Sequence, residues 1–384
     1  MFLFLLLISN VIFGQISTLI DLTPKGVLDK VYDQEGNQYN LSDLIIDNGS
    51  ATSKSVLVTC SSTSYFNLYF ELGCGMDSTT DLVQIARRNV ICKVFEDISN
   101  FINSPLSITG NKVNIWVRNI ADITSSAGTL GVATAFNIIP NVTNNVGGII
   151  DNEVWKTIHT GIDSYANVAS PLVPNSPSTS TPGLFYHAMM AFNFAGTTMW
   201  NTNLGIATPS TNVALYSVAL HEITHALGFA SAIDQNGASK FGTKNYYNRY
   251  DTFLKNSASS QFLLNNTGTC NPMYNNIFTL NNTILQPANA LPNTPLPNAT
   301  NCNNAIKFVG SIYTVPVYTP NVYSIGSSFS HFEDMCFINT LTGLPYGKDV
   351  YFVMSNASST GHTKRFLKKE ERAALCDIGY NVNN

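Results

Sequence analysis

The stretch YSVALHEITHALGFA, residues 216–230, constrains the fold of this 384-residue chain more than any other. Its apolar residues recur at helical spacing, which predicts a helix from roughly 212 to 231. Within it, His221, Glu222 and His225 spell H-E-x-x-H. Residues i and i+4 of a helix share one face, so both imidazoles can bind one metal ion. The carboxylate of Glu222 can then accept a proton from a water molecule on that metal.

A catalytic zinc ion takes three protein ligands and keeps one position open, so two histidines are not enough. Gly228 follows the motif where a helix can end and the chain can turn. The most familiar continuation would place a third histidine at position 231, but this chain has Ser231. The motif therefore predicts a zinc site whose third ligand must be found elsewhere.

Five residues can be considered for that role: His159, His187, His331, His362 and Asp234. His159 reads as a surface or helix-end residue, and His362 reads as an exposed loop residue. His187 lies in the aromatic run FYHAMMAF, which is typical of a packed strand or of a strand that lines a cleft. Asp234 follows the glycine closely enough to supply a carboxylate. The residues alone leave this choice open.

The sequence HEITHALGF resembles the metzincin zinc endopeptidases, in which the helix stops at the glycine and the chain returns with a third ligand. It is most similar to the leishmanolysin branch, which has a long insertion before that ligand. The resemblance implies that His331, in the Ser-His-aromatic context SHF (330–332), completes a site for one Zn²⁺ ion. It also implies that Met354, in VMS, forms the structural methionine turn of the family, with Met335 as the weaker alternative.

Alternating and helical apolar patterns indicate the order of elements before the motif. We expect a helix at 81–102, capped by Thr80 or Ser78, and strands at 64–72, 112–120, 129–139 and 181–194. This order predicts an α+β or α/β fold: a metzincin-like subdomain with a twisted, mostly parallel sheet and two long helices, then a loop- and β-rich C-terminal part. A short helix is expected at 368–380.

Composition favours a secreted protein without a nucleic-acid or anionic-membrane partner, since the net charge is −4 and only 11% of residues are charged. The apolar run at 1–15 is typical of a signal peptide, and no later run of about 18 apolar residues predicts a membrane anchor. The predicted divisions are 1–15 (signal), 16–232 (zinc-binding catalytic subdomain), 233–330 (Asn/Pro-rich insertion) and 331–384 (third ligand and methionine turn).

The chain has seven cysteines and no C-x-x-C pair, so a cysteine zinc site is not expected. In an oxidising compartment we expect up to three disulfides, with Cys270–Cys302 and Cys336–Cys376 as plausible pairs. A long inhibitory prodomain is not indicated. Cys60 and Cys74 are candidates for a thiolate cap on the metal, with a structural disulfide favoured for Cys74.

Together these features predict a secreted zinc metalloendopeptidase that hydrolyses protein or peptide substrates, with Glu222 as general base and acid and His221, His225 and His331 on the metal. Two other classes stay open. One is a secreted binding or adhesion protein with a zinc-stabilised fold and no turnover, against which the intact Glu222 argues. The other is a metallohydrolase acting on a non-peptide substrate. The sequence makes no prediction of oligomeric state.

Overall fold

The computed structural model describes residues 30–46, 54–58, 60, 65–103, 112–120, 128–139, 147–161, 185–242, 245–256, 261–265, 273–274, 306–320 and 323–383. The signal peptide predicted at 1–15 and the predicted Cys270–Cys302 pair lie outside these residues. Four α-helices occur in the described part: α1 (Leu82–Phe101), α2 (Glu153–Thr160), α4 (Leu215–Ala226) and α5 (Lys369–Asp377). None of the described helices has the length and apolar character needed to cross a bilayer.

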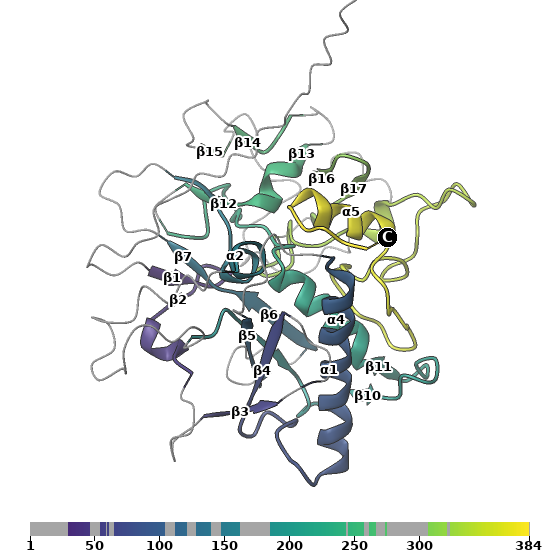
Figure 1. The fold of residues 1–384 in the computed structure, drawn as a ribbon. Helices are drawn as coiled ribbons and strands as arrows, with labels where there is room; N and C mark the ends of the chain where they lie inside the picture. The colour runs from purple at the N-terminus through teal and green to yellow at the C-terminus, as the bar shows by residue number, and fades with distance from the viewer. Residues whose placement is uncertain are drawn as a thin grey trace, which may run out of the picture.

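A five-stranded mixed sheet forms one layer of the fold (Figure 1). In spatial order its strands are β3 (Ser55–Val58), β4 (Phe66–Glu71), β5 (Val113–Asn119), β9 (Ala188–Phe192) and β6 (Gly131–Ala135). The central pairs β4–β5 and β5–β9 are parallel, whereas the edge strands β3 and β6 pair antiparallel. The predicted mixed α/β class is confirmed, but the sheet is only half parallel, because both edge strands reverse direction against their neighbours.

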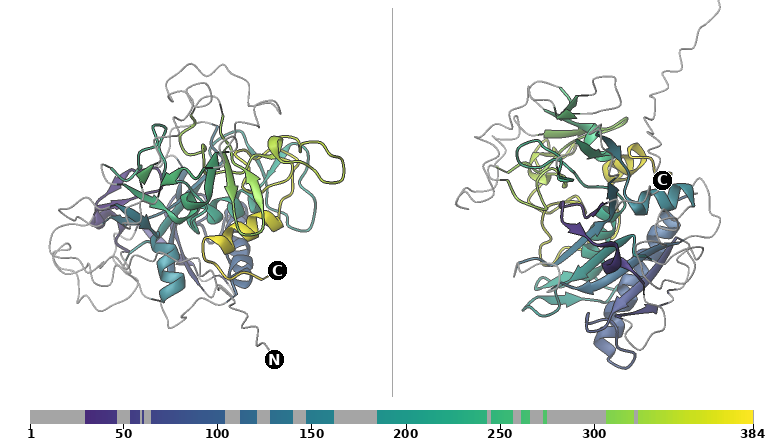
Figure 2. Two further views of the ribbon diagram at one scale, coloured as in Figure 1. Left: turned by 90° about the horizontal axis from the view of Figure 1, so that it is seen from above. Right: turned by 90° about the vertical axis from the view of Figure 1, so that its left-hand side faces the viewer.

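Helices α1 and α4 pack side by side against the sheet, as Figures 1 and 2 show, and their apolar faces join its main core. Helix α1 agrees with its prediction in extent but not in its cap. Asp81 is the N-cap, and its carboxylate accepts hydrogen bonds from the backbone N–H groups of Val83 (2.8 Å) and Gln84 (3.2 Å). The hydroxyl of Ser78 instead accepts from the backbone N–H of Asp81 (2.9 Å), so Ser78 bonds the N-cap residue and not the first turn of the helix.

The remaining strands form small sheets around the main one. They are β1 (Lys30–Tyr32), β2 (Gln38–Tyr39), β7 (Asn137–Ile139), β8 (Gly148–Ile150), β10 (Met199–Asn201), β11 (Asn212–Ala214), β12 (Tyr246–Asn248), β13 (Leu254–Asn256), β14 (Leu264–Asn265), β15 (Met273–Tyr274), β16 (Ile306–Val309) and β17 (Thr314–Pro316). The strand predicted at 129–139 is thus two strands, β6 and β7, which belong to different sheets. Helix α2 was not predicted.

The segment 233–330 shares its core with the rest of the chain. Strand β12 pairs in parallel with β8, which lies before the H-E-x-x-H helix. Tyr250, Phe308 and Val317 are buried in the same apolar cluster as Leu220 and Ile223 of α4. The described parts of this segment are therefore packed onto the H-E-x-x-H helix through a common core.

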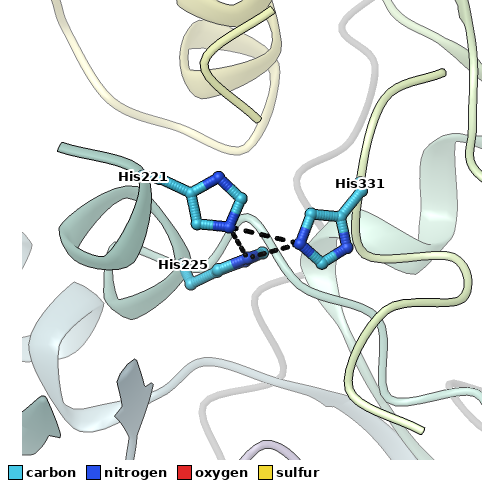
Figure 3. Close-up of side chains that lie close together, drawn as sticks. All are labelled: His221, His225 and His331. Carbon is cyan, nitrogen blue, oxygen red and sulfur yellow. Dashed lines mark hydrogen bonds between the residues drawn. The ribbon is translucent and has the colours of Figure 1, made fainter. Parts of the chain in front are cut away.

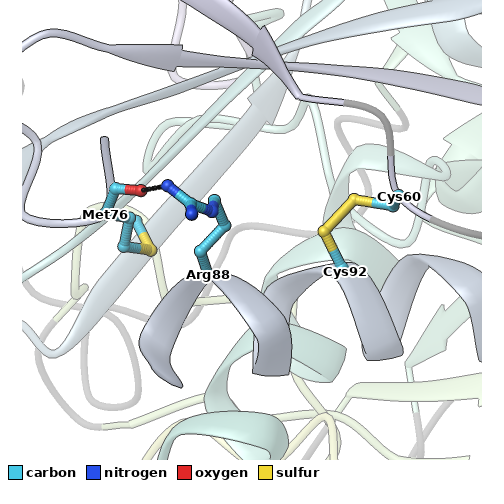
Figure 4. Close-up of a disulfide and its surroundings, with 4 residues drawn as sticks. All are labelled: Cys60, Met76, Arg88 and Cys92. Atoms are coloured by element: carbon cyan, nitrogen blue, oxygen red, sulfur yellow. Dashed lines mark hydrogen bonds between the residues drawn. A yellow bond between two sulfur atoms is a disulfide. The ribbon is translucent and has the colours of Figure 1, made fainter. Parts of the chain in front are cut away.

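The described cysteines pair differently from the prediction. Cys60 and Cys92 form a disulfide that ties the chain before β4 to α1 (Figure 4). Cys376 is a free, exposed thiol, so the predicted Cys336–Cys376 pair is wrong, although Cys336 is itself disulfide-bonded. Cys74 is a free thiol and buried, so the disulfide favoured for it is also wrong.

Candidate metal centre

Helix α4 supplies two of the three histidines that form the candidate site. It follows β11 directly and ends at Ala226, and Gly228 then adopts a φ of 108°, which favours glycine and turns the chain away from the helix axis. His221 and His225 lie one helical turn apart, and their Nε2 atoms are 3.0 Å from each other. The helix predicted at 212–231 is confirmed, although it is shorter at both ends.

The third histidine comes from far along the chain. Nε2 of His331 lies 3.1 Å from that of His225 and 3.2 Å from that of His221. Figure 3 shows the three rings converging on one point, two from the helix and one from the segment that passes opposite it. No other group of three or more metal-ligating side chains occurs among the described residues. The structure therefore brings together the three predicted zinc ligands.

Each imidazole is oriented by a backbone carbonyl on its far side. Nδ1 of His221 lies 2.8 Å from the carbonyl oxygen of Val353, and Nδ1 of His225 lies 2.7 Å from that of Phe229. Nδ1 of His331 lies 2.8 Å from the carbonyl oxygen of Ser327. Because a carbonyl only accepts, each Nδ1 must carry the proton, and each Nε2 then presents a lone pair.

The three Nε2 lone pairs face one another, and a hydrogen bond between two of these nitrogens would need a proton on one of them. Burial is the main reason that the pKa of each imidazole falls to about 3, so all three rings are neutral and none supplies a second proton. Three nitrogens held about 2.0–2.1 Å from a tetrahedral zinc ion would lie about 3.3 Å from one another. The observed separations of 3.0–3.2 Å fit this arrangement with angles slightly below tetrahedral. The donor set and its spacing both fit a zinc ion.

Glu222 is buried between α4 and the edge strand β6. Its carboxylate accepts a hydrogen bond from the backbone N–H of Ala133, and burial raises its pKa to about 8. Gly131 makes this placement possible, since a Cβ atom there would lie 2.9 Å from Oε1 of Glu222. The carboxylate is not one of the three converging groups, so it is free to act on a proton rather than to hold a metal.

Met354 is fully buried, and its turn contacts both parts of the site. The Met354 carbonyl accepts from the backbone N–H of Phe332 (2.8 Å), next to His331, and the preceding Val353 carbonyl orients His221. Met335, the alternative, lies in a short 3-10 helix, η6 (Asp334–Cys336). Met354 thus lies in a turn beside the three histidines, and its role as the methionine turn of a zinc site stays a prediction.

Two buried carboxylates hold this turn in place. Asp334 accepts from the backbone N–H groups of Tyr351 and Phe352, both at 3.0 Å. Glu371 of α5 accepts from the backbone N–H of Met354 (2.6 Å) and is completely buried. Sequence reasoning missed both residues. An acidic residue that falls on the buried face of a short helix, as Glu371 does, is the signal that could have found one of them.

The rival ligands lie in other settings. Asp234 caps a turn, where its carboxylate accepts from the backbone of Gln235 (2.7 Å). His362 is half-exposed, as expected, and contacts the backbone carbonyl of Asp349 (2.6 Å). His187 is a core residue whose Nδ1 accepts from the backbone of Asn114 (2.9 Å). None of the three belongs to the converging group.

His159 lies at the end of α2, one of its two expected positions, but it is buried rather than on the surface. Its ring stacks on Trp155 and bonds the backbone of Gly379 (2.9 Å), so it joins α2 to the C-terminal segment. Neither candidate for a thiolate cap joins the three histidines in the described part of the chain, because Cys60 is in a disulfide and Cys74 is not in the converging group.

Comparison of the chain with protein-family models, with curated proteins and with solved structures gave no match.

Proposed function

We propose that this protein is a secreted zinc metalloendopeptidase in which His221, His225 and His331 hold one Zn²⁺ ion. The observation that carries the proposal is the convergence of three Nε2 lone pairs within 3.0–3.2 Å, each fixed by a backbone acceptor at Nδ1. Such outer hydrogen bonds are the usual support of histidine metal ligands.

A zinc ion bound there would polarise a carbonyl oxygen and lower the pKa of a water molecule. In such a site Glu222 would act as the general base that accepts the proton of the attacking water and as the general acid that returns it to the leaving amine. The dry setting of Glu222, which raises its pKa to about 8, favours a carboxyl group that can both accept and release a proton near neutral pH.

Two further observations support the peptidase assignment and the secreted location. Met354 follows the third histidine in the order found in the metzincin pattern, and its turn lies against the ligands. The Cys60–Cys92 disulfide is a bond that persists in oxidising compartments and is rare in the cytosol. Both agree with the resemblance carried by HEITHALGF and SHF.

The test measures zinc content and casein cleavage side by side for the wild type, Glu222→Ala, His331→Ala and Asp234→Ala. We expect one zinc per chain and cleavage in the wild type and in Asp234→Ala. Glu222→Ala should keep zinc and lose cleavage, whereas His331→Ala should lose both. Zinc retained in His331→Ala would refute the ligand set. Zinc without cleavage in the wild type would favour the binding-protein or non-peptide alternatives.

A further inference from the structure

Ser231 occupies the position at which a third histidine would complete the familiar pattern, and it is completely buried. Its backbone N–H donates to the hydroxyl oxygen of Ser330 at 3.0 Å. Ser330 is itself buried and directly precedes His331. Ser231 is therefore hydrogen-bonded to the segment that contains His331.

Ser231 is in turn held by a buried carboxylate. Its hydroxyl donates to Oδ1 of Asp251 at 2.6 Å, and the backbone N–H groups of Ala232 and Asn248 donate to Oδ2 at 3.0 and 2.8 Å. Asp251 is completely buried, and these three donors give each of its oxygens a hydrogen-bond partner. The chain immediately after Gly228 is therefore fixed by side-chain bonds rather than by regular secondary structure.

Backbone bonds hold the His331 segment on the side away from the H-E-x-x-H loop, where Phe332 N–H donates to the Met354 carbonyl and Glu333 N–H donates to the Pro316 carbonyl. Phe329 has a φ of 69°, a left-handed conformation that costs a bulky residue free energy and persists only when neighbours enforce it. Tyr318 provides one such restraint, because its backbone accepts from the N–H of Phe329 (3.1 Å) and donates to the carbonyl of His331 (2.8 Å). Between these two bonds, the hydroxyl of Ser330 provides the described side-chain link to the H-E-x-x-H side of the site.

We propose that Asp251, Ser231 and Ser330 form a positioning network for His331, acting through the Ser330 hydroxyl. The inference rests on the proposed zinc site and deepens it. One helix fixes the spacing of His221 and His225, whereas contacts with other segments must fix the position of His331 relative to that helix. The network provides such a contact, since Ser231 lies in the loop that follows this helix and bonds Ser330.

The experiment compares Ser330→Ala with Ser239→Ala as a matched control. Ser239 is also buried and lies in the loop that carries Ser231, but its hydroxyl bonds the backbone of Phe241 (3.0 Å) and Tyr246 instead of the His331 segment. Zinc affinity is measured by chelator competition, and ligand geometry by the visible absorption of the Co²⁺-substituted protein. Asp251→Asn is the second variant, and Ser330→Thr, which keeps the hydroxyl, is the rescue.

We expect Ser330→Ala and Asp251→Asn to bind zinc about 10–100-fold more weakly, the usual effect of losing an outer-shell partner, and to shift the Co²⁺ bands. Ser239→Ala and Ser330→Thr should stay within about threefold of the wild type, well inside that range. The double variant Ser330→Ala/Asp251→Asn should lose less than the product of the two single effects, because both act through Ser231.

A merely structural role would lower the melting temperatures of Ser330→Ala and Ser239→Ala alike and leave zinc affinity and the Co²⁺ bands unchanged, which would overturn the inference. Unchanged affinity in Asp251→Asn would overturn it too, even if Ser330→Ala did not fold. A wild type that binds no zinc would refute the proposed site and this inference together. If the wild type binds zinc and all the variants bind it equally tightly, only this inference would be refuted.

Discussion

The placement of Glu222 depends on the absence of a side chain at Gly131, and Gly131→Ala tests that dependence. A Cβ atom at this position would lie 2.9 Å from Oε1 of Glu222, 3.2 Å from its Cγ and 2.9 Å from Cγ1 of Val218. Ordinary contacts begin near 3.4 Å, so the carboxylate must move by about half an ångström or β6 must separate from α4. Gly131 does not have a left-handed φ, so alanine introduces no backbone strain.

The expected effect is on turnover and not on metal binding. Displacing a catalytic group by about 1 Å can cost about 100-fold in rate, equivalent to about 2.7 kcal/mol. We therefore expect kcat/KM for a quenched fluorescent peptide to fall between about 10- and 100-fold in Gly131→Ala, with zinc content unchanged. Gly128→Ala is the matched control, because a Cβ atom there meets nothing within 4 Å. Equal activities of the two variants would refute the reasoning, and loss of zinc from Gly131→Ala alone would show that the clash disturbs the ligands instead.

Three further predictions follow from the described contacts. Glu371→Gln should weaken zinc binding about 10-fold by loosening the turn at Met354. Glu370→Gln, its neighbour on α5, should not, because Glu370 contacts the Tyr351 hydroxyl (3.2 Å) and not the Met354 backbone; chelator competition on both variants decides this. Burial raises the pKa of Asp251 from 3.8 to about 6, so the folded state holds this proton more tightly than the unfolded state does. Urea unfolding of the metal-free protein should therefore show stability falling as the pH rises from about 4 to 6, and this fall should be about 3 kcal/mol smaller in Asp251→Asn; an equal fall in the two proteins would contradict the assignment. Opening the Cys60–Cys92 bond, whose sequence separation is 32 residues, with a double Ser variant should cost about 3–4 kcal/mol of stability, and a melting temperature equal to that of the wild type would count against this estimate.

The parts of the site that could be predicted are those encoded locally. The spacing of His221 and His225 fixes their common face once a helix is inferred, and the apolar stripe of α4 made that inference safe. The position of His331 could be expected only from its resemblance to a known pattern, because no local rule connects residues 106 positions apart. Its place beside the other two is a finding, while its role as a ligand is still a prediction.

Other features carry no signal in a single sequence. The carbonyls of Phe229, Ser327 and Val353 orient the imidazoles, and a backbone group does not depend on residue type. The direction of the edge strands β3 and β6 depends on how the chain crosses the sheet, which alternation within a strand does not encode. Cysteine pairing depends on three-dimensional proximity, which is why the Cys336–Cys376 prediction, based on local segments, was wrong.

The hydrogen bond between Ser231 and Ser330 has a consequence for how the length of such a chain can change. Closing a flexible loop between His225 and His331, whose sequence separation is 106, would cost about 4 kcal/mol in chain entropy. Here the folded core and the Ser231–Ser330 contact already hold the two ends together, so an arriving ion does not have to supply that free energy. The strength of the proposed metal site is thereby uncoupled from the length of the chain that separates the three histidines. Surface loops between Ser231 and Ser330 can be lengthened or shortened over evolution without changing the chemistry at the three histidines.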